Sequence, residues 1–137
     1  DKGNLARTAN HLVGTGMTRS AAFKAAWLMA KHGGVTKVAG VTFDNRQQLI
    51  ARLATYSPDM VSITLQRDKD NVFDPQAVAV VASVKDKGSA TIGFIPAMTA
   101  RTLSRLMDKG TTFKASLDAI VGGYQGLSYG ARLRVAI

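Results

Sequence analysis

Residues 65–80 have the sequence LQRDKDNVFDPQAVAV and join two apolar stretches through a polar loop. Before the loop, apolar and polar residues alternate over 61–66, which predicts a half-buried strand. After the loop, residues 77–84 are almost all apolar and rich in Val, which predicts a strand buried on both faces. The loop itself, residues 67–76, is polar except for one apolar pair that contains Phe73. We therefore predict an ordered loop that presents an aromatic side chain among Asp, Asn and Pro.

The same patterns predict the elements on either side of this stretch. Residues 86–88, Asp-Lys-Gly, suit a hairpin turn, and Pro96 suits the first turn of a helix. Strands with short turns and two inserted helices indicate a mainly β fold with helices (α+β), namely a small, partly closed antiparallel β-barrel of the OB or SH3-like kind. Further strands are expected at 35–43, 90–95, 113–121 and 127–135, and helices after Asp44-Asn45 and over 96–109.

Residues 1–34 are predicted to form an N-terminal helical appendage, a hairpin of two helices separated by Gly14-Thr15-Gly16. The second helix carries Phe23, Ala26, Trp27 and Ala30 at positions i, i+3, i+4 and i+7, which makes one apolar stripe. The β-barrel domain is expected to occupy residues 35–137.

The charge of the chain points to an anionic partner. Lys and Arg number 18 against nine acidic residues, for a net charge of +9. Such an excess is self-repulsive in a compact chain, so nucleic acid, an anionic membrane surface and an acidic protein are the partners to weigh. All nine acidic residues are Asp, which excludes a Glu general base and a Glu metal ligand.

Other functional classes are excluded by composition. The chain has no cysteine, which removes disulfides, thiolate zinc sites and a cysteine nucleophile and fits a reducing compartment. Neither His11 nor His32 has neighbours at zinc-ligand spacing. No apolar run approaches the roughly 18–20 residues that span a bilayer, and there is no signal-peptide pattern. We expect no metal, no cofactor, no membrane partner and a cytoplasmic location, in a bacterial cytosol or nucleoid or as a phage-encoded protein.

The stretch at 65–80 resembles the central signature of HIRAN domains. The resemblance continues through Gly88 and Ile92-Gly93-Phe94-Ile95-Pro96, and residues 38–43 are similar to the family's first strand, so it covers about 35–137. It implies a small OB-related barrel that binds DNA without catalysing a reaction, in DNA repair or replication-fork processing. In a helicase-like member type it implies capture of the 3′ end of a single DNA strand, with aromatic side chains stacked on the terminal bases and an Asp at the free hydroxyl.

Matched position by position, the resemblance assigns the stacking side chains to Phe43, Phe73 and Tyr129. It assigns Asp74 to the terminal hydroxyl, with Asn71 shortly before the aromatic-Asp pair. The physical chemistry agrees: an aromatic face that holds a base contributes roughly 1–3 kcal/mol by alanine substitution. A carboxylate repels phosphate but accepts a hydrogen bond from a free hydroxyl, so Asp74 would favour an end over an internal phosphodiester. Asp74 also suits an Asx turn into Pro75, and both roles can hold at once.

Four positions depart from the family pattern. Thr42 stands where the family has Arg before the first aromatic residue, and Ala97 where the end-binding type has Lys. Val72 replaces a common Pro, and Phe73 replaces a common Tyr, which removes a phenolic hydrogen bond but keeps the stacking face.

Several basic residues are candidates for phosphate contact. Arg101, Arg105 and Lys109 follow i, i+4 and i+8 on the 96–109 helix, either as a solvated face or as a phosphate-tracking stripe. Arg132 shares one strand face with Arg134. Arg67 is expected to hold the loop by pairing with Asp68, Asp70 or Asp74, or to contact phosphate.

Two other functional classes remain open. The spacing of Asp68, Asp70 and Asp74 could hold a divalent cation, as in a metal-dependent nuclease, although the Ca²⁺-loop pattern fails at Val72 and Phe73. The Trp27 helix could bind a protein partner, mediate self-association, or make the chain an assembly subunit of a larger nucleic-acid-processing complex.

Overall fold

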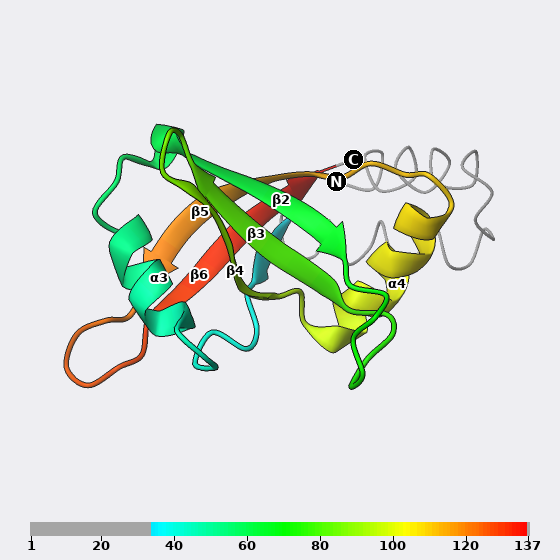
Figure 1. The fold of residues 1–137 in the computed structure, drawn as a ribbon, viewed down its shortest axis with the longest axis horizontal. Helices are drawn as coiled ribbons and strands as arrows, with labels where there is room; N and C mark the ends of the chain where they lie inside the picture. The colour runs from blue at the N-terminus through cyan, green and yellow to red at the C-terminus, as the bar shows by residue number, and fades with distance from the viewer. Residues whose placement is uncertain (1–33, 137) are drawn as a thin grey trace.

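A computed structural model describes residues 34–136, in which six strands form one antiparallel sheet (Figure 1). The order across the sheet is β1-β6-β5-β2-β3-β4. The strands are β1 (Val35–Lys37), β2 (Val61–Arg67), β3 (Val78–Val84), β4 (Gly88–Phe94), β5 (Lys114–Val121) and β6 (Gly130–Ala136). The other elements of this part of the chain are α3 (Arg46–Leu53), the 3-10 turn η1 (Pro58–Met60) and α4 (Ala97–Asp108). The prediction of a mainly β fold with helices is confirmed, whereas the predicted helical hairpin at 1–34 lies outside the described residues.

The core follows from the periodicity of the sequence. In β2, Val61, Ile63 and Leu65 are buried, and the polar residues between them are exposed. β3 has a strand on each side and is buried along most of its length, as the apolar run predicted. α4 contributes Ala100 and Leu103 to the same buried cluster as the strands. The sheet and α4 therefore share one hydrophobic core.

The sheet bends, so that β1 lies behind β3 in Figure 1, but the described residues form no continuous ladder that closes it into a barrel. The two ends of the strand order meet at one place. There Ala39 and Phe94 exchange both backbone hydrogen bonds, with N···O distances of 2.7 and 2.9 Å. The prediction of a partly closed barrel is therefore not confirmed; the observed architecture is an open sheet whose edges touch at one residue pair.

The first strand is shorter than the predicted 35–43. β1 ends at Lys37, and after the bridge at Ala39 the chain turns at Gly40, which has a φ of +70°. Glycine adopts this left-handed conformation without the steric cost that a Cβ brings. Phe43 therefore lies in the turn between β1 and α3 and not at the end of a strand, because extended pairing stops at Gly40.

Candidate nucleic-acid interface

The side chain of Asn71 organises the loop between β2 and β3. Its Oδ1 accepts hydrogen bonds from the backbone N–H groups of Phe73 and Asp74, at 2.9 and 3.0 Å. Its Nδ2 donates to Asp68 Oδ2 at 3.2 Å. Asn71 thus uses both ends of its amide to set the backbone that carries the aromatic-Asp pair.

The loop presents Phe73 to solvent. Its side chain is 95% exposed, and the neighbouring Val72 is 88% exposed. An exposed aromatic ring on a hydrogen-bonded loop contributes little to the core, but it offers both faces to a planar ligand. The expectation that the polar neighbours keep this ring out of the core is confirmed.

Asp74 is half-buried and forms the predicted turn. Its Oδ1 accepts a hydrogen bond from the backbone N–H of Gln76 at 2.9 Å, across Pro75. Among the described residues, its Oδ2 has no hydrogen-bond partner. The carboxylate therefore keeps one oxygen that can accept a further donor.

Arg67 ties this loop to the end of α4. Its guanidinium donates to the backbone carbonyls of Ala77 and Pro75, at 2.7 and 3.0 Å. It also donates to both carboxylate oxygens of Asp108, at 3.0 and 3.3 Å. The expected partners Asp68, Asp70 and Asp74 are therefore wrong, although the expectation that Arg67 holds the loop is confirmed.

The ion pair also affects Asp108. The hydrogen bond from Arg67 lowers the pKa of the Asp108 carboxyl below its ordinary value, against a smaller effect of desolvation. The positive charges of Arg67 and Lys69 act in the same direction, and Lys69 Nζ lies 3.9 Å from Asp108 Oδ1. The carboxylate form of Asp108 is thus part of the anchor that holds the loop.

The turn that carries Phe43 has its own anchor in Arg46. Arg46 Nη1 donates to the carbonyl of Gly40 at 2.7 Å, and its guanidinium carbon lies 5.1 Å from the centre of the Phe94 ring. Arg46 also pairs with Asp44 at 3.8 Å. This cation–π and hydrogen-bonded arrangement leaves Phe43 65% exposed.

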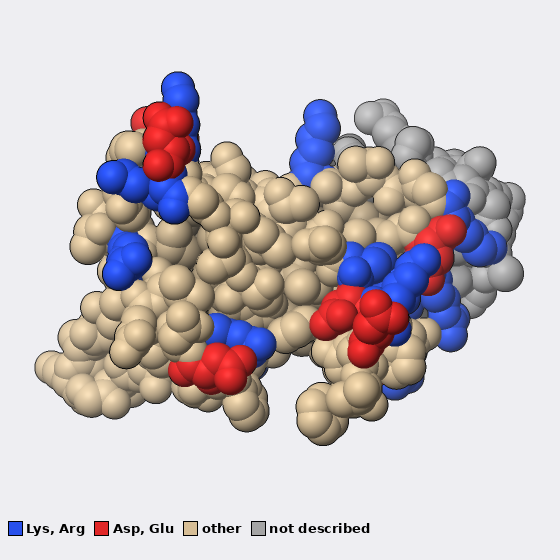
Figure 2. Space-filling view, in the orientation of Figure 1, with Lys and Arg blue, Asp and Glu red and all other residues tan. Residues whose placement is uncertain are grey.

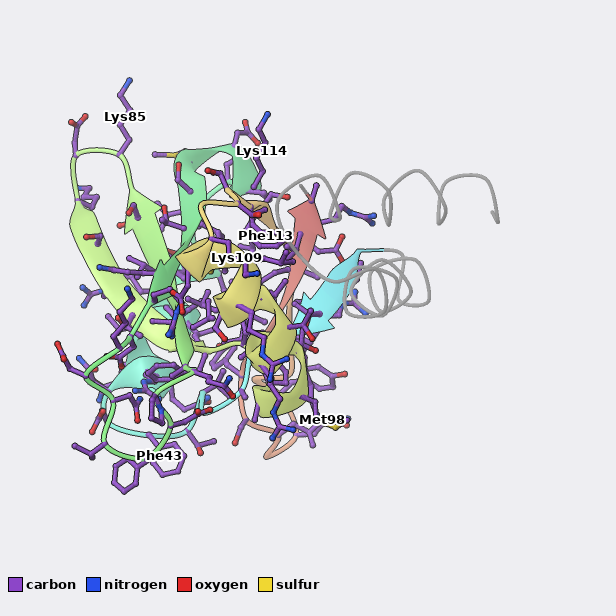
Figure 3. All side chains as sticks on the ribbon, turned by 90° about the vertical axis from the view of Figure 1, so that its right-hand side faces the viewer. Phe43, Lys85, Met98, Lys109, Phe113 and Lys114 are labelled. Carbon is purple, nitrogen blue, oxygen red and sulfur yellow. The ribbon has the colours of Figure 1, made fainter. Side chains whose placement is uncertain are left out.

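The tertiary structure brings the turn of Phe43 and the loop of Phe73 to the same edge. The turn leaves from Ala39, which pairs with Phe94, and Phe94 in turn pairs with Ala79 at the start of β3, just after the loop. Figure 3 places Phe43 and Met98 at the lower end of the molecule, opposite Lys85 and Lys114. Figure 2, drawn in the orientation of Figure 1, shows a notch in the lower edge of the molecule between two projections. Acidic and basic side chains lie on both sides of this notch. The turn that carries Phe43 and the loop that carries Phe73 therefore lie on the same side of the molecule (Figure 1).

Tyr129 differs from the other two aromatic residues because it is partly buried. Its ring packs so closely on Gly123 that a Cβ there would overlap it. Its backbone is held by the Gln47 side chain, which accepts from the Tyr129 N–H at 2.8 Å and donates to its carbonyl at 2.8 Å. The same Gln47 Nε2 donates to the Val41 carbonyl at 2.9 Å, which places Tyr129 beside the turn of Phe43.

The candidate phosphate-binding residues lie on two elements. Arg101 and Arg105 are exposed on α4, and Leu103 and Leu106 on its other side are buried, as the spacing predicted. Arg132 is exposed on β6, where its Nε lies 3.6 Å from Asp118 Oδ2. Arg132 and Arg134 share one strand face, since both pair with Asp118.

Within residues 34–136, no three acidic or histidine side chains converge on a point where they could hold a metal ion. The same part of the chain contains no helix long and apolar enough to span a bilayer.

Sequence reasoning missed Arg46 and Gln47, the two residues that join the Phe43 turn to its surroundings. Both stand at the start of a helix, where they look like ordinary exposed helix residues. Their partners are backbone carbonyls, which every residue has, so no local pattern marks them.

The comparisons with known proteins agree with this architecture. The family model described as HIRAN domain matches residues 34–121, which leaves Tyr129 and Arg132 beyond the match. A crystal structure of a protein from Lactobacillus plantarum is similar, with 21% sequence identity, a TM-score of 0.51, and coverage of 76% of this chain and 93% of that chain. The comparison with curated proteins gives no match. HIRAN domains are generally associated with binding of single-stranded DNA and its 3′ ends. Because the family model matches well over half of the sequence, the chain belongs to the HIRAN domain family.

Proposed function

We propose that this domain captures a free 3′ end of single-stranded DNA at the edge formed by the Phe73 loop and the Phe43 turn. The observation that carries the proposal is the 95% exposed Phe73 ring on a loop whose backbone is tied down by Asn71. A ring this exposed contributes little to the stability of the fold, whereas both of its faces can stack on a planar ligand such as a nucleobase.

Each residue of the edge has a role in this proposal. Phe73 and Phe43 stack on the terminal bases, and Asp74 accepts a hydrogen bond from the terminal hydroxyl through its second oxygen. Asn71 and Arg67 position the loop, because their polar groups are engaged with it.

Electrostatics supports selectivity for an end. Asp74 lies in a loop that also contains Asp68 and Asp70, whereas the basic residues of the loop, Arg67 and Lys69, lie against Asp108. An internal phosphate at this point therefore meets net negative charge. Basic residues lie further along, with Arg101 and Arg105 exposed on α4. We therefore place the free end of the captured strand at the loop and assign Arg101 and Arg105 to the phosphates next to that end. Arg132 is a secondary phosphate contact, and Tyr129 supports the turn of Phe43 and offers a partly covered stacking face.

The function is binding and not catalysis, and we place it in DNA repair or replication-fork processing, where free 3′ ends arise.

The test is fluorescence anisotropy with a labelled single strand whose 3′ end carries either a hydroxyl or a phosphate. We expect the phosphate to weaken binding about tenfold, equivalent to about 1.4 kcal/mol. Phe73→Ala should weaken binding of the hydroxyl strand to a similar extent, within the range for one stacked base. Asp74→Asn should reduce the difference between the two strands.

Val72→Ala is the matched control, because Val72 is an 88% exposed apolar neighbour on the same loop. It should bind like the unmodified protein. Equal binding of the two strands with a steep dependence on salt would refute end capture and leave only the attraction of a basic protein for a polyanion.

A further inference from the structure

The hairpin tip between β5 and β6 exposes an aromatic and an aliphatic side chain. Tyr124 is 62% exposed and Leu127 is 58% exposed. They flank a tight turn in which the Leu127 N–H donates to the Tyr124 carbonyl at 2.9 Å. The central residues Gln125 and Gly126 have φ of +51° and +78°, as in a type I′ turn. Tyr124 is therefore presented by a well-defined turn.

A shallow pocket lies between this hairpin and α3. It is lined by tyrosine, glutamine, serine, one leucine and small residues, and no charged side chain contributes to it. Aromatic faces and side-chain amides are the groups that stack on nucleobases and bond to their edges, whereas phosphate requires cations or N–H clusters. The chemistry of the pocket therefore suits an uncharged planar ring. Its main lining residues are Gln47, Gln48, Tyr124, Gln125, Ser128 and Tyr129.

Two of the three glutamines can serve a ligand. The amide of Gln47 is occupied by backbone groups of Val41 and Tyr129. Gln48 and Gln125 are exposed. They stand on opposite sides of the pocket, one on α3 and one at the hairpin tip.

The pocket is continuous with the edge described above. Gln47 bonds to both Val41 and Tyr129, so the hairpin lies next to the turn that carries Phe43. Along the lower side of Figure 1, the β5–β6 hairpin, the turn before α3 and the loop between β2 and β3 follow one another from left to right. Each of these three segments carries an exposed aromatic residue: Tyr124, Phe43 and Phe73 respectively.

We propose that the Tyr124 hairpin is a second nucleobase subsite, which holds an internal nucleotide of the same strand whose end is bound at Phe73. This proposal rests on the end-capture function proposed above. It adds that the domain binds a strand longer than the terminal nucleotides, because three stacking surfaces lie along one edge.

The test compares a short strand of about four thymidines with a longer one of about twelve, both with a free 3′-hydroxyl. We expect the longer strand to bind more tightly. Tyr124→Ala should weaken the longer strand by about tenfold, as expected for one lost stacking contact, and should leave the short strand unchanged. Tyr124→Phe keeps the ring and should bind within about twofold of the unmodified protein.

Met60→Ala is the control for loss of an exposed apolar side chain, since Met60 is 44% exposed and lies in η1, away from the hairpin. Equal affinity of the two strands, or a longer strand that is insensitive to Tyr124→Ala, would overturn the second subsite. If the short strand still prefers a free end to a blocked one, end capture survives that result. If neither strand binds, both proposals are wrong.

Discussion

Replacing Arg67 with methionine removes the guanidinium that fastens the Phe73 loop and keeps most of the apolar stem of the side chain. Arg67 is 13% exposed and makes four hydrogen bonds, two to backbone carbonyls and two to Asp108. We expect Arg67→Met to lower the free energy of unfolding by about 2 kcal/mol.

The magnitude follows from the surroundings of each bond. The Asp108 side chain is 41% exposed to solvent. Its ion pair with Arg67 therefore contributes about 0–1 kcal/mol to the free energy of unfolding. The bonds to Ala77 and Pro75 come from a charged donor, for which about 1.5–3 kcal/mol is typical. The Ala77 carbonyl keeps the Asp68 N–H as a partner at 3.0 Å, and Pro75 is exposed to water. Both acceptors therefore stay partly satisfied, so the two bonds together contribute about 2 kcal/mol, which is near the low end for a single bond from a charged donor.

Urea unfolding followed by circular dichroism measures this change, with thermal unfolding as a second readout. A loss of about 2 kcal/mol corresponds to a decrease in melting temperature of roughly 7–9 °C for a domain of this size. Arg105→Met is the matched control, because Arg105 is exposed on α4 and should change stability by less than about 0.5 kcal/mol.

Measuring DNA affinity at several salt concentrations shows whether Arg67 anchors the loop or contacts DNA phosphate directly. If Arg67 positions the loop, the affinity for a free DNA end should fall without a change in the salt dependence, because no phosphate contact is lost. An Arg67→Met protein as stable as the Arg105→Met control would show that the loop keeps its conformation without the Arg67 hydrogen bonds. That result would refute the role of Arg67 as an anchor.

Two further predictions concern the anchor and the sheet edge. Because the pKa of the Asp108 carboxyl is lowered in the folded state, the stability that it contributes is present above the ordinary value of 3.8 and is lost as the pH falls through the folded value. Asp108→Asn should therefore be less stable than the unmodified protein at neutral pH and equally stable once the carboxyl is protonated; a gap that persists unchanged in acid would contradict this. Gly93→Ala should cost about 3 kcal/mol in urea unfolding, because a Cβ at this position would overlap the Val38 side chain and the Ala39 carbonyl. Gly130→Ala, where the backbone φ is not positive and the nearest atom is 3.2 Å away, should cost about 1 kcal/mol or less, and equal costs would argue against a close approach at Gly93.

Local patterns predicted most of the secondary structure. The alternation in β2, the apolar run in β3 and the Pro at the start of α4 place these elements within three residues of their observed ends. The same patterns placed Phe73 outside the core, since its neighbours are Asp, Asn and Pro, and predicted the Asx turn at Asp74. In these cases the decisive interactions lie within a few residues along the chain.

The sequence failed where a residue's partner is distant. The charges near Arg67 suggested a loop Asp as its partner, but the partner is Asp108, which lies 41 positions away. The chain has nine aspartates, and a local sequence pattern cannot tell which of them pairs with Arg67. Only the packing of α4 beside the loop brings Asp108 to it. The bond between Gln47 and Tyr129, 82 positions apart, escaped prediction for the same reason.

The sequence by itself determined which segments form strands, most of the side chains that are buried and which loop presents an aromatic ring, because periodicity records burial residue by residue. The tertiary structure alone decided that the sheet stays open, that β1 ends at Lys37, and that the Phe43 turn and the Phe73 loop come together on either side of Phe94 in β4. These features depend on where distant parts of the backbone meet, at Ala39 and Phe94, and backbone hydrogen-bonding groups are the same in every residue except proline.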